Sequence, residues 1–193
     1  VPALFQQLAL NYRSVPGVFL ENLAIAESAG MRTFYGLRPG IDLVAHGLPP
    51  WSYQLGSFLP NQTESFMVLH PRDPPPPALA AQTIVPEPIR CETLSGLCAT
   101  HDLSRIDFLQ IDTEGYDYRV LQGLNFEKIL PRFINYERIH LKKEEAACRR
   151  FLTKKGYVLL DHGQDTLATW CREVPLAEKI KEWFYCRWLE MIF

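Results

Sequence analysis

The sequence lacks the features of several familiar protein classes. Its 5 cysteines include no C-x-x-C pair, so neither a zinc ribbon nor a disulfide framework is indicated. Its 20 Lys and Arg residues are balanced by 22 Asp and Glu residues, so it has no basic stripe for a nucleic-acid backbone. No run approaches the roughly 18 consecutive apolar residues that a membrane span needs. We therefore expect a cytoplasmic protein with no nucleic-acid partner and no membrane span.

A glycine-rich loop between a strand and a helix is also absent. Neither the G-x-G-x-x-G pattern nor a Walker pattern occurs in the 193 residues. The backbone N–H groups of such a loop are a common binding site for nucleotide cofactors. The residues by themselves therefore assign no cofactor loop.

Apolar residues are plentiful, with 47% hydrophobic and 12% aromatic content, so the chain can bury one substantial core and a single domain is expected. Residues 39–88 form a proline-rich segment in which regular structure must be short. This segment also carries too many large apolar side chains for a solvated tether. We expect it to be a lid or a substrate-facing insertion, with an interdomain linker as the alternative.

The order of the predicted elements indicates the fold class. Helical spacing predicts helices from residue 2 to the turn at residues 16–17, and at residues 93–98, 116–122 and 142–155. Apolar, β-favouring runs predict strands at residues 18–26, 31–37, 107–111, 133–137, 157–160 and 166–170. This alternation favours an α/β fold with a mostly parallel, doubly wound sheet. Residues 173–193 are expected to form a C-terminal helix that docks on this core or on a partner.

Two carboxylates and a glycine directly follow an apolar strand in the segment Ile111-Asp112-Thr113-Glu114-Gly115. In open parallel sheets, functional groups gather at the carboxyl ends of the strands. Asp112 and Glu114 could there orient a substrate hydroxyl, accept its proton or hold a divalent cation, although nothing else supports a metal. Alternatively, the same residues are ordinary signals for the start of a helix.

Glu137 ends the next predicted strand and His140 follows closely, so both could face the same crevice as Asp112. Histidine is the natural titrating group at such a position, which makes His140 a catalytic candidate and Glu137 a substrate-binding candidate. The alternative is that His140 is a hydrogen-bonded structural residue beside a strand end.

Three parts of the chain together resemble the FkbM family of S-adenosylmethionine-dependent methyltransferases. They are residues 1–11 with the segment Asn22-Leu23-Ala24-Ile25-Ala26, the strand and turn at residues 106–115, and the strand at residues 133–137. The resemblance implies a Rossmann-like class I methyltransferase sheet, mostly parallel with one antiparallel strand. It defines a partial domain at residues 1–172.

The resemblance also implies roles for individual residues. Ala24 and Ile25, at the end of the family's third strand, would line the adenine pocket of S-adenosylmethionine. Asp112 and Glu114 would face the methyl donor and acceptor. The segment Gly56-Ser57-Phe58 is similar to a serine-containing segment of the family, which makes Ser57 a candidate near the substrate.

This sequence departs from the family at its start, because the family's first strand, its glycine-containing loop and its ribose-binding acid have no counterpart. In the usual strand order 3-2-1-4-5-7-6, the first two strands lie between the third and the fourth. The N-terminal strands are thus expected to be missing, which would leave unpaired backbone groups at the sheet edges. Either the third strand pairs directly with the fourth, or the chain needs a partner.

The resemblance implies O-methylation of a hydroxyl on a small molecule or a glycan, such as a sugar or a secondary metabolite, by a chain expected to be inactive alone. The first alternative is a non-catalytic Rossmann-like interaction module, with a homo-oligomer or another partner bound through the C-terminal helix. A third hypothesis, a magnesium-dependent phosphatase with Asp112 as its nucleophile, ranks last because Glu114 stands where such a site needs a second aspartate.

Overall fold

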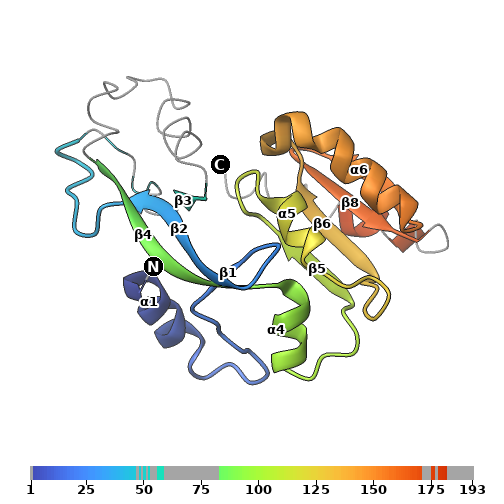
Figure 1. The fold of residues 1–193 in the computed structure, drawn as a ribbon, viewed down its shortest axis with the longest axis horizontal. Coiled ribbons are helices and arrows are strands. Elements are labelled where there is room, and N and C mark those ends of the chain that lie inside the picture. Colours follow the sequence, from blue (N-terminus) through green and yellow to red (C-terminus); the bar gives the residue numbers. More distant parts are fainter. Residues whose placement is uncertain are drawn as a thin grey trace.

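The computed structural model describes residues 2–46, 48, 50, 52, 56–58, 83–170, 175–176 and 178–181. These residues form a mixed α/β fold with two four-stranded sheets, which lie side by side (Figure 1). Sheet A has the strand order β1-β4-β2-β3, and sheet B has the order β5-β6-β8-β7. No described helix is both long enough and apolar enough to cross a membrane.

Sheet A is built around a long antiparallel pair. Its strands are β1 (Ala24–Ile25), β2 (Gly30–Leu37), β3 (Gly56–Ser57) and β4 (Ile84–Glu92). β4 lies between β1 and β2, parallel to the first and antiparallel to the second. Helix α1 (Pro2–Tyr12) precedes this sheet and α4 (Leu94–Thr100) follows it, with Thr93 capping the α4 N-terminus through a hydrogen bond from Gly96 N.

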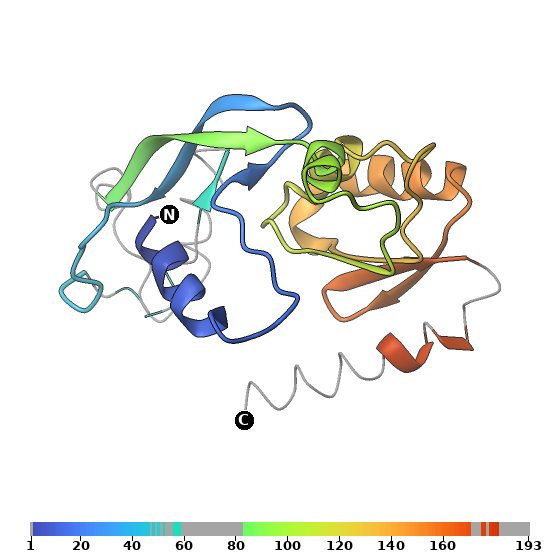
Figure 2. The same ribbon diagram turned by 90° about the horizontal axis from the view of Figure 1, so that it is seen from below.

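Sheet B contains the strand ends that matter for function. Its strands are β5 (Phe108–Ile111), β6 (Phe133–Glu137), β7 (Val158–His162) and β8 (Asp165–Thr169). β5 and β6 are parallel, and α5 (Asp117–Gln122) lies in the connection between them. After β6, a 3-10 helix η2 (Ile139–Glu144) leads into α6 (Glu145–Lys154), which covers one side of sheet B in the views of Figures 1 and 2.

The prediction of one mostly parallel sheet with a single antiparallel strand is wrong. In the described residues only the β1–β4 and β5–β6 pairs are parallel, and the other four pairings are antiparallel. Parallel neighbours need a crossover of about a dozen residues or more, whereas β7 and β8 are joined by a two-residue turn. The short connection therefore makes this pair antiparallel.

The strand order of sheet B nevertheless agrees with the last four strands of the methyltransferase order, since β5-β6-β8-β7 corresponds to 4-5-7-6. The expected third strand is β1, which pairs with β4 of sheet A and has no ladder to β5 among the described residues. Direct pairing of the third and fourth strands is thus wrong for the described part of the chain. The need for a partner stays a prediction.

Two predicted boundaries are also corrected. The strand expected at residues 18–26 is limited to Ala24–Ile25, and the preceding Phe19 is 76% exposed. The helix expected at residues 142–155 begins at Glu145, because Lys142 has φ 50° and ψ −118°, which interrupts helical geometry. The other predicted helices and strands up to residue 170 are confirmed with shifts of a few residues at their ends.

The proline-rich segment 39–88 does not extend as far as predicted, because β4 begins inside it at Ile84. Pro86 and Pro88 lie within β4, opposite residues of β2. β1 pairs only with Cys91 and Glu92, so no ladder on that side requires an N–H group from either proline. Of the expected lid, residues 47, 49, 51, 53–55 and 59–82 lie outside the described residues.

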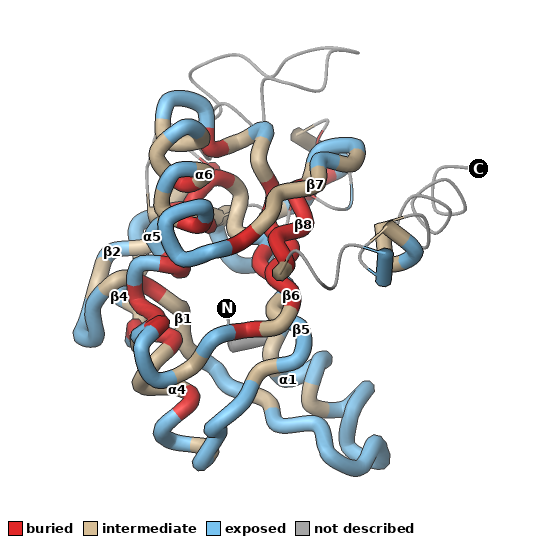
Figure 3. Tube along the Cα trace, turned by 90° about the vertical axis from the view of Figure 1, so that its right-hand side faces the viewer, coloured by how far each residue is buried: buried red, intermediate tan, exposed pale blue. Residues whose placement is uncertain are grey.

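One core connects the two sheets. It combines Ala26 and Cys91 from the sheet A side with Ile111, Ile134 and other residues of sheet B and its helices. The red segments of the tube in Figure 3 show that burial is densest along β6 and β8. Of the expected C-terminal helix, only residues 175–176 and 178–181 are described, and Ile180 there packs near Phe133 on the other face of sheet B.

Gly123 lies where β1, α4 and α5 meet. A Cβ atom at this position would be 2.7 Å from the backbone oxygen of Ala26, and Gly123 O accepts a hydrogen bond from Ser95 N. We predict that Gly123→Ala lowers the free energy of unfolding by about 1–3 kcal/mol, because backbone atoms cannot yield as side chains do. Urea denaturation measures this loss.

Gly96→Ala is the matched control for this substitution. A Cβ atom at Gly96 would meet the flexible side chain of Glu92, which can move, and alanine is favoured over glycine inside a helix. This variant should be as stable as the wild type or more so. Equal losses in the two variants would contradict the backbone contact as the cause.

Candidate active site at the ends of strands β5 and β6

The carboxyl ends of the parallel strands β5 and β6 lie next to each other. In their ladder Ile111 is opposite Tyr136, so the next residues, Asp112 just after β5 and Glu137 at the end of β6, lie side by side. The sequence prediction that both residues face one edge is therefore supported by the register. Asp112 stays exposed to solvent, whereas Glu137 is only 8% exposed.

Three predicted site residues converge at this edge. His140 Nδ1 lies 2.6 Å from Glu137 Oε2 and 3.1 Å from Glu114 Oε2. One ligand-type atom from each of the three side chains lies within 4.8 Å of the other two. The β5–α5 turn, the end of β6 and the 3-10 helix η2 thus each contribute one side chain to this cluster, which we call the Glu–Glu–His cluster.

The backbone of the β5–α5 turn places Glu114. Its φ is 53°, and that of Gly115 is 92°, so two successive residues are in the left-handed half of the φ range. A glycine reaches this conformation without steric cost, whereas a glutamate rarely does. The turn leads directly into α5 and leaves the Glu114 carboxylate beside His140.

Burial and like charges make both glutamates of the cluster hard to ionise. Desolvation, with the nearby Glu137 carboxylate as the next cause, raises the pKa of Glu114 to about 7, although His140 opposes this rise. Desolvation also raises the pKa of Glu137 to about 8, with Asp112 and Asp117 adding to it. The surroundings of both glutamates therefore disfavour their charged forms.

Asp112 is more exposed to solvent than the two glutamates of the cluster. The surrounding protein desolvates its carboxyl group and raises its pKa, with Asp165 acting in the same direction and His140 opposing it. A solvent-accessible carboxylate beside a buried polar cluster is suited to orient a hydroxyl group or to accept its proton. This role of Asp112 stays a prediction.

Asp117, which the sequence analysis overlooked, fixes the relative position of the two strand ends. It is fully buried at the first position of α5. Its Oδ1 accepts a hydrogen bond of 3.1 Å from Glu137 N, and its Oδ2 accepts one of 2.8 Å from Thr113 Oγ1. Desolvation raises the pKa of Asp117, and the hydrogen bonds from Thr113 and Glu137 oppose this. The sequence signal that could have identified Asp117 was its position at the start of a short predicted helix, beside other carboxylates.

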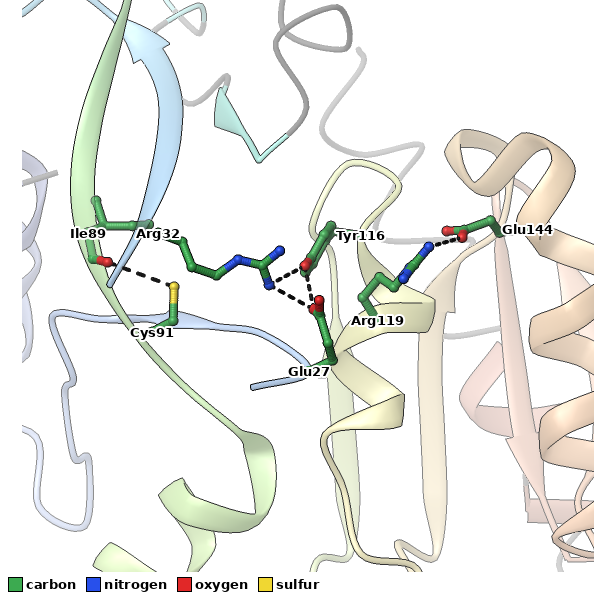
Figure 4. A network of polar contacts seen from close by, with 7 residues as sticks. All are labelled: Glu27, Arg32, Ile89, Cys91, Tyr116, Arg119 and Glu144. Carbon is green, nitrogen blue, oxygen red and sulfur yellow. Dashed lines mark hydrogen bonds and ion pairs between the residues drawn. The ribbon is translucent and has the colours of Figure 1, made fainter. Parts of the chain in front are cut away.

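A second polar network links sheet A to α5 (Figure 4). Arg32 Nη1 donates to Glu27 Oε2 at 2.9 Å and to the Tyr116 hydroxyl at 2.7 Å, and this hydroxyl donates to Glu27. The Arg32 guanidinium also lies 4.8 Å from the centre of the Phe58 ring. Glu27 directly follows the predicted third strand, so the rule that singled out Asp112 could have found it too.

The remaining predicted residues lie away from the Glu–Glu–His cluster. Ser57 is buried in β3, although its neighbour Phe58 contacts the Tyr116 ring at 4.7 Å between centroids. Ala24 lines a cavity of about 360 Å³, whereas Ile25 packs against the main core. The cavity also borders Asn22 and Leu23, so it lies toward the amino end of β1, and the adenine pocket was expected at the other end. The roles of Ser57, Ala24 and Ile25 stay predictions.

The family profile described as the methyltransferase FkbM domain matches residues 19–159. The chain belongs to the FkbM methyltransferase family. The match contains both strand ends and the whole Glu–Glu–His cluster, while the quoted resemblance at residues 1–11 lies outside it. Comparisons with curated proteins and with solved structures gave no match.

FkbM methyltransferases use S-adenosylmethionine. The described residues fit this cofactor poorly, because the cavity at Ala24 lies at the wrong end of β1. At the carboxyl end of β1, the Glu27 carboxylate is already bound by Arg32 and Tyr116. The described part of the chain also has no glycine-rich loop after a strand. This part therefore does not form a complete cofactor site by itself.

Proposed function

We propose that this FkbM domain takes part in O-methyl transfer to a hydroxyl group of a small molecule or a glycan, and that it supplies the acceptor side of the site. The observation that carries the proposal is the meeting of Asp112, Glu114, Glu137 and His140 at the joined ends of β5 and β6. Family membership supports the transfer of a methyl group, and S-adenosylmethionine supplies that group when bound.

The chemistry that this domain must provide is positioning and proton removal. Bound S-adenosylmethionine would supply the methyl group, and this chain's own residues would hold the acceptor hydroxyl in place and take up its proton. Asp112 is exposed at the end of β5 and can accept that proton. The Glu–Glu–His cluster lies beside it and gives the acceptor side of the site a polar surface that suits hydroxyl groups.

The sugar-like class of acceptor follows from the polar character of this edge. Carboxylates and an imidazole bind hydroxyl groups well, whereas covering this polar edge with an apolar acceptor would cost desolvation free energy that no new hydrogen bond offsets. Asp117 accepts a hydrogen bond from Glu137 N and so holds the backbone of Glu137, and the Glu137 carboxylate contacts His140. We therefore propose a polyhydroxylated acceptor over an apolar one.

The test measures binding of S-adenosylmethionine by calorimetry and methyl transfer from the labelled donor to a panel of sugars and phenols. Both are measured on this chain and on the longest polypeptide that contains it. Saturable binding with transfer to a hydroxyl acceptor is the expected result for at least the longer form. Absence of donor binding in both forms would contradict the proposal and favour a non-catalytic interaction module.

A further inference from the structure

We propose that the Glu–Glu–His cluster is a binding site for one divalent cation, held by Glu114, Glu137 and the imidazole of His140. Nothing in the family match assigns a metal to this domain. The site differs from the carboxylate pair that the sequence suggested, because it leaves Asp112 out and takes in a nitrogen ligand from η2.

The distances within the cluster suit a single ion. Metal-to-ligand distances for nitrogen and carboxylate oxygen are about 2.1 Å, so two ligands of one ion lie roughly 3–4 Å apart. The three ligand-type atoms here lie within 4.8 Å of one another, and the pair from Glu114 and His140 is 3.1 Å apart. The 2.6 Å contact of His140 with Glu137 must open slightly as the ion replaces the proton between them.

The electrostatic environment also favours a cation. Glu137 feels the like charges of Asp112, Asp117 and Asp165, and the His140 ring contacts both the Glu114 and the Glu137 carboxylates. Partly buried carboxylates in such numbers repel one another, and a bound divalent ion offsets this repulsion more fully than one imidazole does.

The ligand atoms of the cluster, and the contacts that hold these side chains in place, narrow the choice of ion. Two carboxylates with one imidazole suit Mn²⁺ and similar divalent ions better than soft metals, which prefer thiolates. Asp117 holds the backbone of Glu137, and the 2.7 Å ion pair of Arg119 with Glu144 ties η2 to α5. Such outer contacts keep metal ligands oriented. In the proposed methyl transfer, the ion would bind the acceptor hydroxyl. This role of the ion rests on the proposed function, whereas the metal site itself does not.

The experiment titrates Mn²⁺ into the metal-free full chain by calorimetry and follows the free Mn²⁺ signal by electron paramagnetic resonance. Neither donor nor acceptor is present, so the result is independent of methyl transfer. We expect one Mn²⁺ per chain and at least tenfold weaker binding in Glu137→Gln and His140→Asn. Circular dichroism confirms that each variant folds, and Glu114→Gln replaces any variant that does not.

Glu145→Gln and His162→Asn are matched controls, because these residues lie outside the cluster and should bind Mn²⁺ like the wild type. Absence of saturable binding by the wild type would overturn the metal site. So would binding that persists unchanged in all cluster variants, since the ion would then be held elsewhere.

Discussion

Asp112→Asn is expected to lower the turnover number of methyl transfer by about 10²–10³-fold, while the affinity for S-adenosylmethionine stays within about twofold. Asparagine keeps the size and the hydrogen-bonding oxygen of the side chain but cannot take a proton from the acceptor. Asp112 lies exposed at the end of β5, where an acceptor can reach it. Steady-state kinetics with calorimetry of donor binding separates the two effects, using the longest polypeptide that contains this domain.

Asp107→Asn is the control for this prediction. Asp107 immediately precedes the same strand at its opposite end, where it forms an exposed ion pair with Arg105. Loss of an exposed pair changes stability little, and the turnover of this variant should equal that of the wild type. Full turnover in Asp112→Asn, or an equal loss in both variants, would count against Asp112 as the acceptor-side base.

Asp117→Ala should lower the free energy of unfolding by about 2–4 kcal/mol. The substitution leaves the buried donor Glu137 N and the partly buried donor Thr113 Oγ1 without their acceptor, and the loss of a buried hydrogen-bond partner costs about 1–3 kcal/mol. Removal of a buried carboxylate recovers part of this cost, because desolvation raises the pKa of Asp117 and its charge is unfavourable there. Urea denaturation at neutral pH measures the difference.

Two further variants isolate the hydrogen bonds from other effects of the substitution. Asp117→Asn keeps one oxygen for Glu137 N and should lose only about 1 kcal/mol. Asp42→Ala removes an exposed aspartate whose Oδ1 accepts one hydrogen bond from Ala45 N, so water can replace it with little loss. If Asp117→Ala and Asp42→Ala are equally stable, Asp117 does not hold the strand ends together.

The elements of this domain were largely predictable because their signals are local. Strand β6 has the predicted bounds Phe133–Glu137, and Thr93 and Gly123 bracket the segment from α4 to α5 as expected of a cap and a helix end. The prediction failed at β4 because prolines there were taken as a sign of short regular structure. The effect of a proline on a strand depends on which side of the strand is paired. That information lies in the partner strand and not in the proline-rich segment.

The candidate site was predicted in part. Glu137 and His140 are three residues apart, and the turn at Glu114 follows a strand, so local rules singled out all three. Their meeting as one cluster needs β5 and β6 to be parallel neighbours in register. The link from Glu27 to Tyr116 spans 89 residues, and no local pattern could join these two side chains.

The sequence by itself determined most of the helices and strands, the family, and the carboxylates that follow β5 and β6, because periodicity, turns and motifs act over a few residues. The tertiary structure alone decided the division into two sheets, their mostly antiparallel pairing and the Glu–Glu–His cluster. The physical reason is that strand pairing and the burial of charge depend on which distant segments the main core brings together.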